Sequence, residues 1–140
     1  MKRIVLAANA EADQPWVADV VAQLARETGA EVAVMSADEL ETEMLSTLPR
    51  DVLQERAAAA ARTACERLHA AGIAAADHHV VSGPALQAIL DFADEQDADL
   101  IVVGSSTRGR LAQRILGSTP LALVQRSSRP VMVVTQPDAT

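Results

Sequence analysis

The residues that could do chemistry gather in one stretch, between Gly104 and Ser118. Glycines at positions 104, 109 and 117 allow the backbone to approach a ligand closely, and Ser118 stands where the N-cap of a following helix is expected. Unpaired amides at a helix start bind anions. The stretch therefore predicts a phosphate site, in which Ser118 is either a ligand contact or an ordinary N-cap.

Three arginines, at positions 108, 110 and 114, stand in the same stretch of a chain whose formal net charge is −7. Guanidinium groups bind phosphate well because they combine a permanent charge with several donors. Arginines are also common as solvated surface residues. A phosphate contact and a plain surface role both stay open for these side chains.

Other reaction types lack the residues that they need. No GxGxxG follows the first expected strand, and GxxxxGK followed by Ser or Thr does not occur, which argues against dinucleotide and P-loop sites. Asn9 and Ser82 stand where a phospho-accepting receiver domain would carry acidic residues. His78 and His79 are adjacent, so in a strand they would point to opposite faces. Without a GxSxG motif either, we expect no catalytic residue, no metal site and at most weak ATP hydrolysis.

Short apolar runs alternate with segments of helical periodicity. The runs predict strands over residues 4–8, 31–36, 78–81, 100–103 and 130–134. The periodic segments predict helices from Pro15 to a C-cap at Gly29, between Pro49 and Gly72, over 86–93 and over 118–126. Strict alternation implies right-handed crossovers and a parallel sheet with helices on both faces. A ligand is then expected beyond the carboxyl ends of the strands, near the loops 9–13, 82–84 and 104–118.

The helix between Pro49 and Gly72 is expected to bury one stripe of side chains. The stripe consists of Val52, Leu53, Ala60, Ala64 and Leu68. Cys65 is expected to be a small buried or half-buried residue of the same helix. The acidic segment 38–43, which precedes this helix, is expected to form a turn-like loop.

The composition is that of one folded domain over residues 1–140. Of these, 49% are hydrophobic and 22% are charged, the balance of a globular chain. The net charge of −7 would repel nucleic acid and anionic membranes, so we expect neither as a partner. Cys65 is the single cysteine, no apolar run reaches about 20 residues, and the apolar start is too short for a signal peptide. We therefore expect a cytoplasmic protein.

The glycine stretch resembles the universal stress protein family, whose hallmark is Gly, two residues, Gly, nine residues, then Gly and Ser or Thr. Here the match runs from Gly104 to Gly117 and Ser118. The resemblance extends to the strand at 4–9, the loop at 82–85, the strand at 98–104 and the segment 129–134, so it covers almost the whole chain. It implies a three-layer α/β/α sandwich with a five-stranded, mostly parallel sheet in the order 3-2-1-4-5.

In the nucleotide-binding branch of the family, the resemblance implies that the loop after the first strand holds adenine and ribose. The glycine loop and the Ser at the helix start would hold the phosphates. The ligand would be ATP or another adenine nucleotide, with Mg²⁺ accompanying it. The site residues implied in this way are Ala7, Ala8, Asn9, Val34, Gly104, Thr107, Gly109, Gly117, Ser118 and Thr119.

Two positions depart from the family pattern. Thr107 replaces the second glycine of the motif, and β-branched residues resist positive φ, although Gly109 could restore the turn two residues later. Asn9 stands where nucleotide binders usually carry an aspartate that accepts from the adenine amino group. Asn can still accept through its carbonyl oxygen, but it adds a donor and loses the charge. These changes predict weaker affinity or a different ligand.

The final strand, Val131 to Val134, is apolar, carries no charge and would lie at a sheet edge in the order expected for this family. An unprotected edge invites pairing, so we predict a homodimer through this strand. The leading functional hypothesis is a regulatory protein that binds an adenine nucleotide and reports stress to a protein partner. The alternatives are a dimeric interaction module without nucleotide, which Thr107 and Asn9 favour, and an ATP-activating enzyme, whose SGGxDS or HIGH-like motifs are absent.

Overall fold

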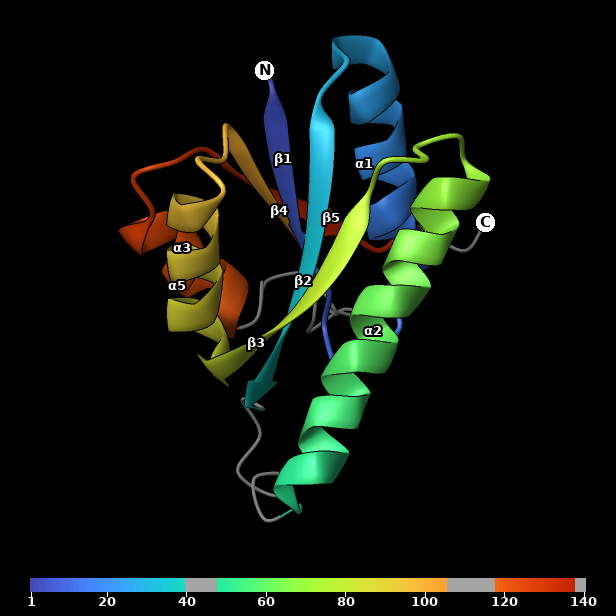
Figure 1. Cartoon of the computed structure of the whole chain (residues 1–140). Helices are drawn as coiled ribbons and strands as arrows, with labels where there is room; N and C mark the ends of the chain where they lie inside the picture. Colours follow the sequence, from blue (N-terminus) through green and yellow to red (C-terminus); the bar gives the residue numbers. More distant parts are fainter. Residues whose placement is uncertain (40–47, 106–117, 138–140) are drawn as a thin grey trace.

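The protein, described by a computed structural model over residues 1–39, 48–105 and 118–137, is built on a five-stranded parallel sheet (Figure 1). The strand order is β3-β2-β1-β4-β5, and every neighbouring pair is parallel. This confirms the order expected from the resemblance. The strands are β1 (Arg3–Ala7), β2 (Glu31–Glu39), β3 (Asp77–Pro84), β4 (Leu100–Ser105) and β5 (Val131–Thr135).

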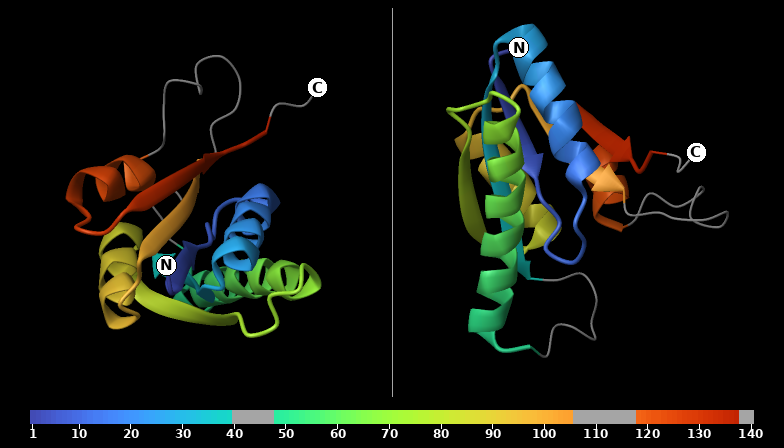
Figure 2. Two further views of the ribbon diagram at one scale, coloured as in Figure 1. Left: turned by 90° about the horizontal axis from the view of Figure 1, so that it is seen from above. Right: turned by 90° about the vertical axis from the view of Figure 1, so that its right-hand side faces the viewer.

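Helices cover both faces of the sheet, which makes the fold a three-layer α/β/α sandwich. They are α1 (Pro15–Thr28), α2 (Arg50–Ala70), α3 (Ala85–Glu95) and α5 (Ser118–Arg126). Seen from above, α1 and α2 lie on one face of the sheet while α3 and α5 lie on the other (Figure 2). None of the helices described is long and apolar enough to cross a membrane.

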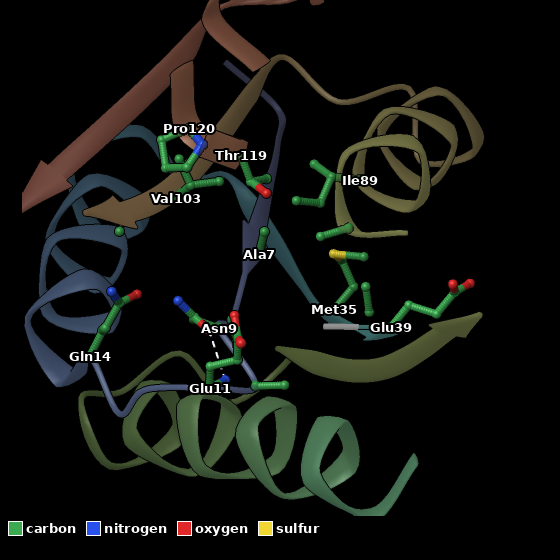
Figure 3. A pocket seen from close by; sticks show the side chains of 15 residues that line it. Ala7, Asn9, Glu11, Gln14, Met35, Glu39, Ile89, Val103, Thr119 and Pro120 are labelled. Atoms are coloured by element: carbon green, nitrogen blue, oxygen red, sulfur yellow. Dashed lines mark hydrogen bonds between the residues drawn. The ribbon is translucent and has the colours of Figure 1, made fainter. Parts of the chain in front are cut away.

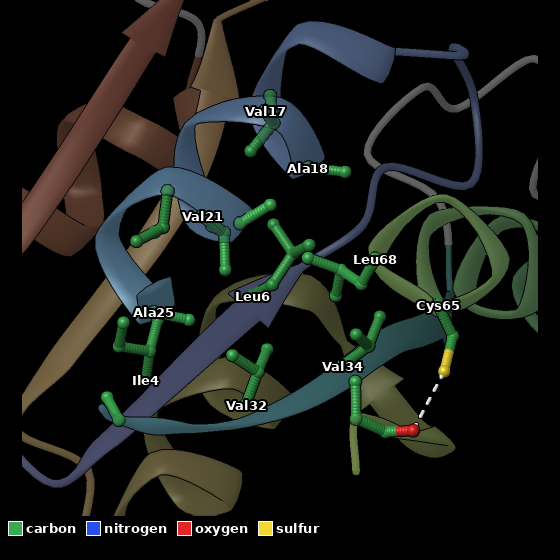
Figure 4. Packing of buried hydrophobic residues seen from close by; sticks show 14 of the residues in the cluster. Ile4, Leu6, Val17, Ala18, Val21, Ala25, Val32, Val34, Cys65 and Leu68 are labelled. Carbon is green, nitrogen blue, oxygen red and sulfur yellow. Dashed lines mark hydrogen bonds between the residues drawn. The ribbon is translucent and has the colours of Figure 1, made fainter. Parts of the chain in front are cut away.

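The alternation of side chains along each strand divides the core into two clusters. In β1, Ile4 and Leu6 pack with α1 and α2, whereas Val5 and Ala7 belong to the cluster under α3. Figure 4 shows the first cluster, where Leu6 meets Leu68 of α2. Both faces of the central strands are buried, which is why their sequences are continuous apolar runs.

The ends of α1 follow the signals in the sequence. Pro15 occupies the first turn, and Gly29 is the C-cap with φ 76°, a left-handed conformation that favours glycine. Its N–H donates to the carbonyl of Ala25 at 2.8 Å. Both predicted ends of this helix are confirmed.

The buried stripe of α2 differs from the expected one. It consists of Leu53, Ala57, Ala61, Cys65 and Leu68. Val52 is 36% exposed and Ala60 and Ala64 are half-buried, because the helix presents a row spaced by four residues to the sheet. Cys65 is buried as expected, and desolvation raises the pKa of its thiol, with smaller contributions from Asp77 and Glu66.

Strand β2 continues to Glu39, so residues 38 and 39 are not part of a turn, and residues 40–43 lie outside the described part. Asp38 is fully buried there. It accepts hydrogen bonds from Ser82 Oγ at 3.0 Å and Gly83 N at 3.1 Å, and it pairs with Arg50 at 2.9 Å. A buried carboxylate needs such partners, and only the folded chain brings them together.

Candidate functional site

A pocket opens at the carboxyl ends of the three central strands, β2, β1 and β4 (Figure 3). It lies where the winding of the sheet reverses, because α1 follows β1 on one face and α5 lies beyond β4 on the other. In open parallel sheets this crevice is the usual ligand site. With its open mouth included, it contains about 530 Å³ of space between the protein atoms.

The last residue of β1, Ala7, and the loop after it, through Ala8 and Asn9, supply one wall. Both backbone groups of Ala8 are hydrogen-bonded to β2. Its N–H donates to the carbonyl of Met35 at 2.8 Å, and its carbonyl accepts from Ser36 Oγ at 2.8 Å. The strand β2 therefore fixes the point at which the chain leaves the sheet. The three predicted residues of this wall all line the pocket.

The opposite wall is formed by the end of β4 and the first turn of α5. Gly104 and Thr119 line the pocket from there, as the resemblance implied. Ser118 begins α5, but its side chain lies outside the described residues. Thr107, Gly109 and Gly117, like the three arginines of the same stretch, lie outside them as well.

Gly104 is explained by packing within the protein. A Cβ at this position would come within 2.6 Å of Val17 Cγ2, and closer still to Gln14 Oε1. Real Cβ atoms almost never approach so closely, so any other residue would require the side chains of Gln14 and Val17, or α1 with them, to shift. The glycine is therefore required for the packing of α1, whatever it does for a ligand.

Val34 does not line this pocket. It is fully buried in the cluster beneath α1 and α2, on the other face of β2. The pocket is lined instead by the next residue, Met35, which pairs with Ala7 in the sheet register. Successive residues of a strand face opposite sides, so a displacement of one residue exchanges the two faces.

Met35, Ile89 and Val103 form an apolar wall that sequence reasoning did not assign. Ile89 and Met35 lie on the same side of the pocket in Figure 3, across from Gln14 at the start of α1. The signal that could have identified Met35 and Val103 is the alternation of their strands, because Val5 and Ala7 share a face with both. The helical spacing of Ile89 does not by itself indicate that this side chain lines the pocket.

The polar side chains among the described residues of the pocket are two amides, two carboxylates and the hydroxyl of Thr119. Asn9 Oδ1 accepts a hydrogen bond from the backbone N–H of Glu11 at 2.7 Å. Gln14, the N-cap residue of α1, makes no side-chain cap bond, and its Nε2 is buried without a hydrogen-bond partner in the described part of the chain. Glu11 and Glu39 supply the carboxylates. Gln14, Glu11 and Glu39 were also missed, since nothing in their local sequence distinguishes them.

The charge and ligand set of the pocket limit its chemistry. No lysine or arginine occurs among the described residues that line it. Within the same part of the chain, no group of three or more His, Cys, Asp or Glu side chains could hold a metal ion. The arrangement offers an apolar wall for a flat ring and hydrogen-bonding groups for a polar tail.

Comparison with known proteins agrees with the fold. The chain matches the family model described as the Universal stress protein family over residues 1–135. A universal stress protein of Mycobacterium tuberculosis is 36% identical over 69 residues, which are 49% of this chain and 47% of that protein. The match thus spans about half the length of the curated relative.

Two solved structures are similar along nearly their whole length. A universal stress protein in complex with cAMP is 26% identical with a TM-score of 0.72, and the match covers 97% of this chain and 98% of that one. A universal stress protein of Archaeoglobus fulgidus in complex with dAMP is 25% identical with a TM-score of 0.70, covering 96% and 98%. The chain described here belongs to the universal stress protein family.

Proposed function

We propose that the protein binds an adenine nucleotide in the pocket between β1 and β4 and acts as a cytoplasmic regulatory protein of the stress response. The observation that carries the proposal is the pocket itself, which joins an apolar wall to two amide side chains at the switch point of the sheet. The two related chains bound to cAMP and dAMP support the same class of ligand.

Different residues of the pocket suit the ring, the ribose and the phosphates of such a ligand. Met35 and Ile89 suit a purine ring, which gains from contact with apolar and polarisable side chains. Gly104 and Thr119 stand at the side where phosphates would lie. Glu11 is placed to accept from ribose hydroxyls, as acidic residues do in other nucleotide sites. We propose that Mg²⁺ enters only with the phosphates of ATP, and that the bound nucleotide is not turned over.

The first test asks what the purified protein carries and what it binds. Denatured protein is analysed for released nucleotides, and AMP, cAMP and ATP, the last with and without Mg²⁺, are then titrated by calorimetry. Trp16 fluorescence gives a second readout, because its indole Nε1 donates to the carbonyl of Val134 at 3.3 Å beside the start of α1. No released nucleotide and no binding at millimolar ATP would overturn the proposal.

A substitution that fills the pocket connects binding to this site. Ala85 lines the pocket at the first turn of α3, so Ala85→Phe is expected to abolish nucleotide binding. Gln87→Phe adds the same ring at an exposed position of the same helix and serves as the matched control. Equal affinity in wild type and Ala85→Phe would place the nucleotide elsewhere.

We also propose that the protein forms a homodimer through the edge of β5. A partner protein would then distinguish the nucleotide-bound dimer from the nucleotide-free one. β5 is an edge strand with half-buried side chains from Val131 to Val134, and α5 beside it exposes Leu121 (47%) and Val124 (52%). Leu121→Glu with Val124→Glu should shift the mass measured by light scattering from dimer to monomer, while Gln125→Glu should not. A dimer that never binds nucleotide would favour the interaction-module alternative.

A further inference from the structure

The orientation of the Asn9 side chain is determined by the backbone. A peptide N–H can only donate, so the Asn9 atom that faces the N–H of Glu11 at 2.7 Å must be the carbonyl oxygen. The amide nitrogen is then the group that Asn9 offers to the pocket. In Figure 3 this nitrogen is directed toward the side where Gln14 lies, and away from Met35 and Ile89.

Gln14 carries a second amide on the same side. Figure 3 shows its oxygen on the side nearer Asn9, and a half-turn of the amide group would bring the nitrogen there. Its side chain extends to Gly104, which it contacts closely, and its Nε2 is buried without a partner within the described residues. A donor that is buried without an acceptor loses its hydrogen bonds to water and gains none within the protein. Such a group at the wall of a pocket indicates an acceptor that arrives with the ligand.

We propose that Asn9 and Gln14 form a pair of donors for the phosphate group of the nucleotide, and that Asn9 does not read the adenine ring. The inference rests on the proposed function, and it states which side of the pocket holds the ring and which side holds the phosphate. The ring belongs against Met35 and Ile89, so the polar tail extends toward the opposite side of the pocket, where Asn9 and Gln14 lie. A phosphate presents only acceptors, which two amide nitrogens complement.

The carboxylate of Glu11 gives a reason why neutral donors suit this site and why an aspartate at residue 9 would weaken phosphate binding. Glu11 lines the pocket beside Asn9, so the site already holds one carboxylate. A second carboxylate at residue 9 would add to the repulsion of an anion. The proposal therefore predicts that Glu11→Gln raises the ratio of AMP affinity to adenosine affinity, while the backbone bond from residue 11 to Asn9 is kept.

The decisive experiment compares adenosine with AMP, since the two differ only in the phosphate. Asn9→Asp and Gln14→Glu replace each donor by an acceptor of nearly the same shape, and Asp can still accept from the N–H of Glu11. Each variant should bind AMP roughly tenfold more weakly while its affinity for adenosine stays within roughly threefold of wild type. Gln23→Glu adds the same charge on the exposed face of α1 and should change neither affinity.

Gln14→Leu separates a ligand contact from a structural role. Removal of an unpartnered buried donor should leave the melting temperature unchanged or raise it, while AMP affinity falls. A lower melting temperature together with unchanged AMP affinity would make Gln14 a structural residue and overturn the inference.

The remaining outcomes distinguish the two proposals. If Asn9→Asp tightens adenosine and AMP equally, the side chain reads the base and the inference is wrong. If wild type binds AMP and neither acidic variant weakens it, the inference also fails, but the proposed function stands. If wild type binds neither adenosine, AMP nor ATP, the proposed function fails and the donor pair fails with it.

Discussion

Val17 of α1 lies against Gly104 of β4 so closely that a Cβ on residue 104 would come within 2.6 Å of Val17 Cγ2. Gly104 lines the pocket beside this contact. The contact also means that the first glycine of the family's motif serves the packing of α1 on the sheet, next to the amide of Gln14.

The first prediction follows from this contact. Gly104→Ala should lower the free energy of unfolding by about 1–3 kcal/mol, because the added methyl group requires the side chains of Gln14 and Val17, or α1 with them, to shift. Urea unfolding measures the loss. In the background of Val17→Ala, which removes one of the clashing atoms, the same substitution should cost less. Equal costs in the two backgrounds would contradict the packing explanation.

The second prediction concerns the two faces of β2. Met35→Ala and Val34→Ala both remove buried side chains, so each should destabilise the protein by about 1–4 kcal/mol. Only Met35→Ala should also weaken nucleotide binding, since only Met35 lines the pocket. Calorimetric titration at a temperature where both variants are folded makes the comparison. A weaker affinity in Val34→Ala of the same size would contradict the assigned register.

The third prediction concerns Asp38, the buried carboxylate at the end of β2. Asp38→Asn replaces an acceptor by a donor opposite Gly83 N or Ser82 Oγ and removes the charge that pairs with Arg50. The loss should be about 1–3 kcal/mol in chemical denaturation. Glu39→Gln makes the same kind of change at the next, exposed residue and should be nearly neutral. A neutral Asp38→Asn would show that the three contacts contribute little.

The fourth prediction is a dependence of stability on pH. The Asp99 carboxylate accepts from the backbone N–H groups of Lys2 at 2.6 Å and Arg3 at 2.9 Å, and these bonds lower its pKa in the folded protein. A lowered folded pKa stabilises the protein above the unfolded value of about 3.9 and loses that contribution as pH falls through the folded pKa.

Asp99→Asn should therefore be less stable than wild type near pH 6, and the difference should shrink as pH falls below about 4. Urea unfolding across this range measures it. A difference that stays constant with pH would mean that the ionised carboxylate is not what the two N–H groups recognise.

The amino-acid sequence determined the elements, and the resemblance to the family supplied the order of the strands in the sheet. Continuous apolar runs such as 100–103, bounded by Asp99 and Gly104, indicate strands buried on both faces, and Pro15 and Gly29 limit α1 for reasons that act within a few residues. The alternation of strands and helices then leads to a parallel sheet with a pocket at its switch point, where Asn9 and Gly104 do lie.

Only the tertiary structure decided which side chains face the pocket and what each contacts. Val34 and Met35 are equally apolar, and the register of β2 against β1 assigns them to opposite faces. The local sequence predicts an acidic turn at Asp38, whereas in the folded chain Asp38 contacts Ser82, Gly83 and Arg50. Gln14 and Gly104 meet across the fold. Such contacts join segments far apart in the chain, so local periodicity carries no information about them.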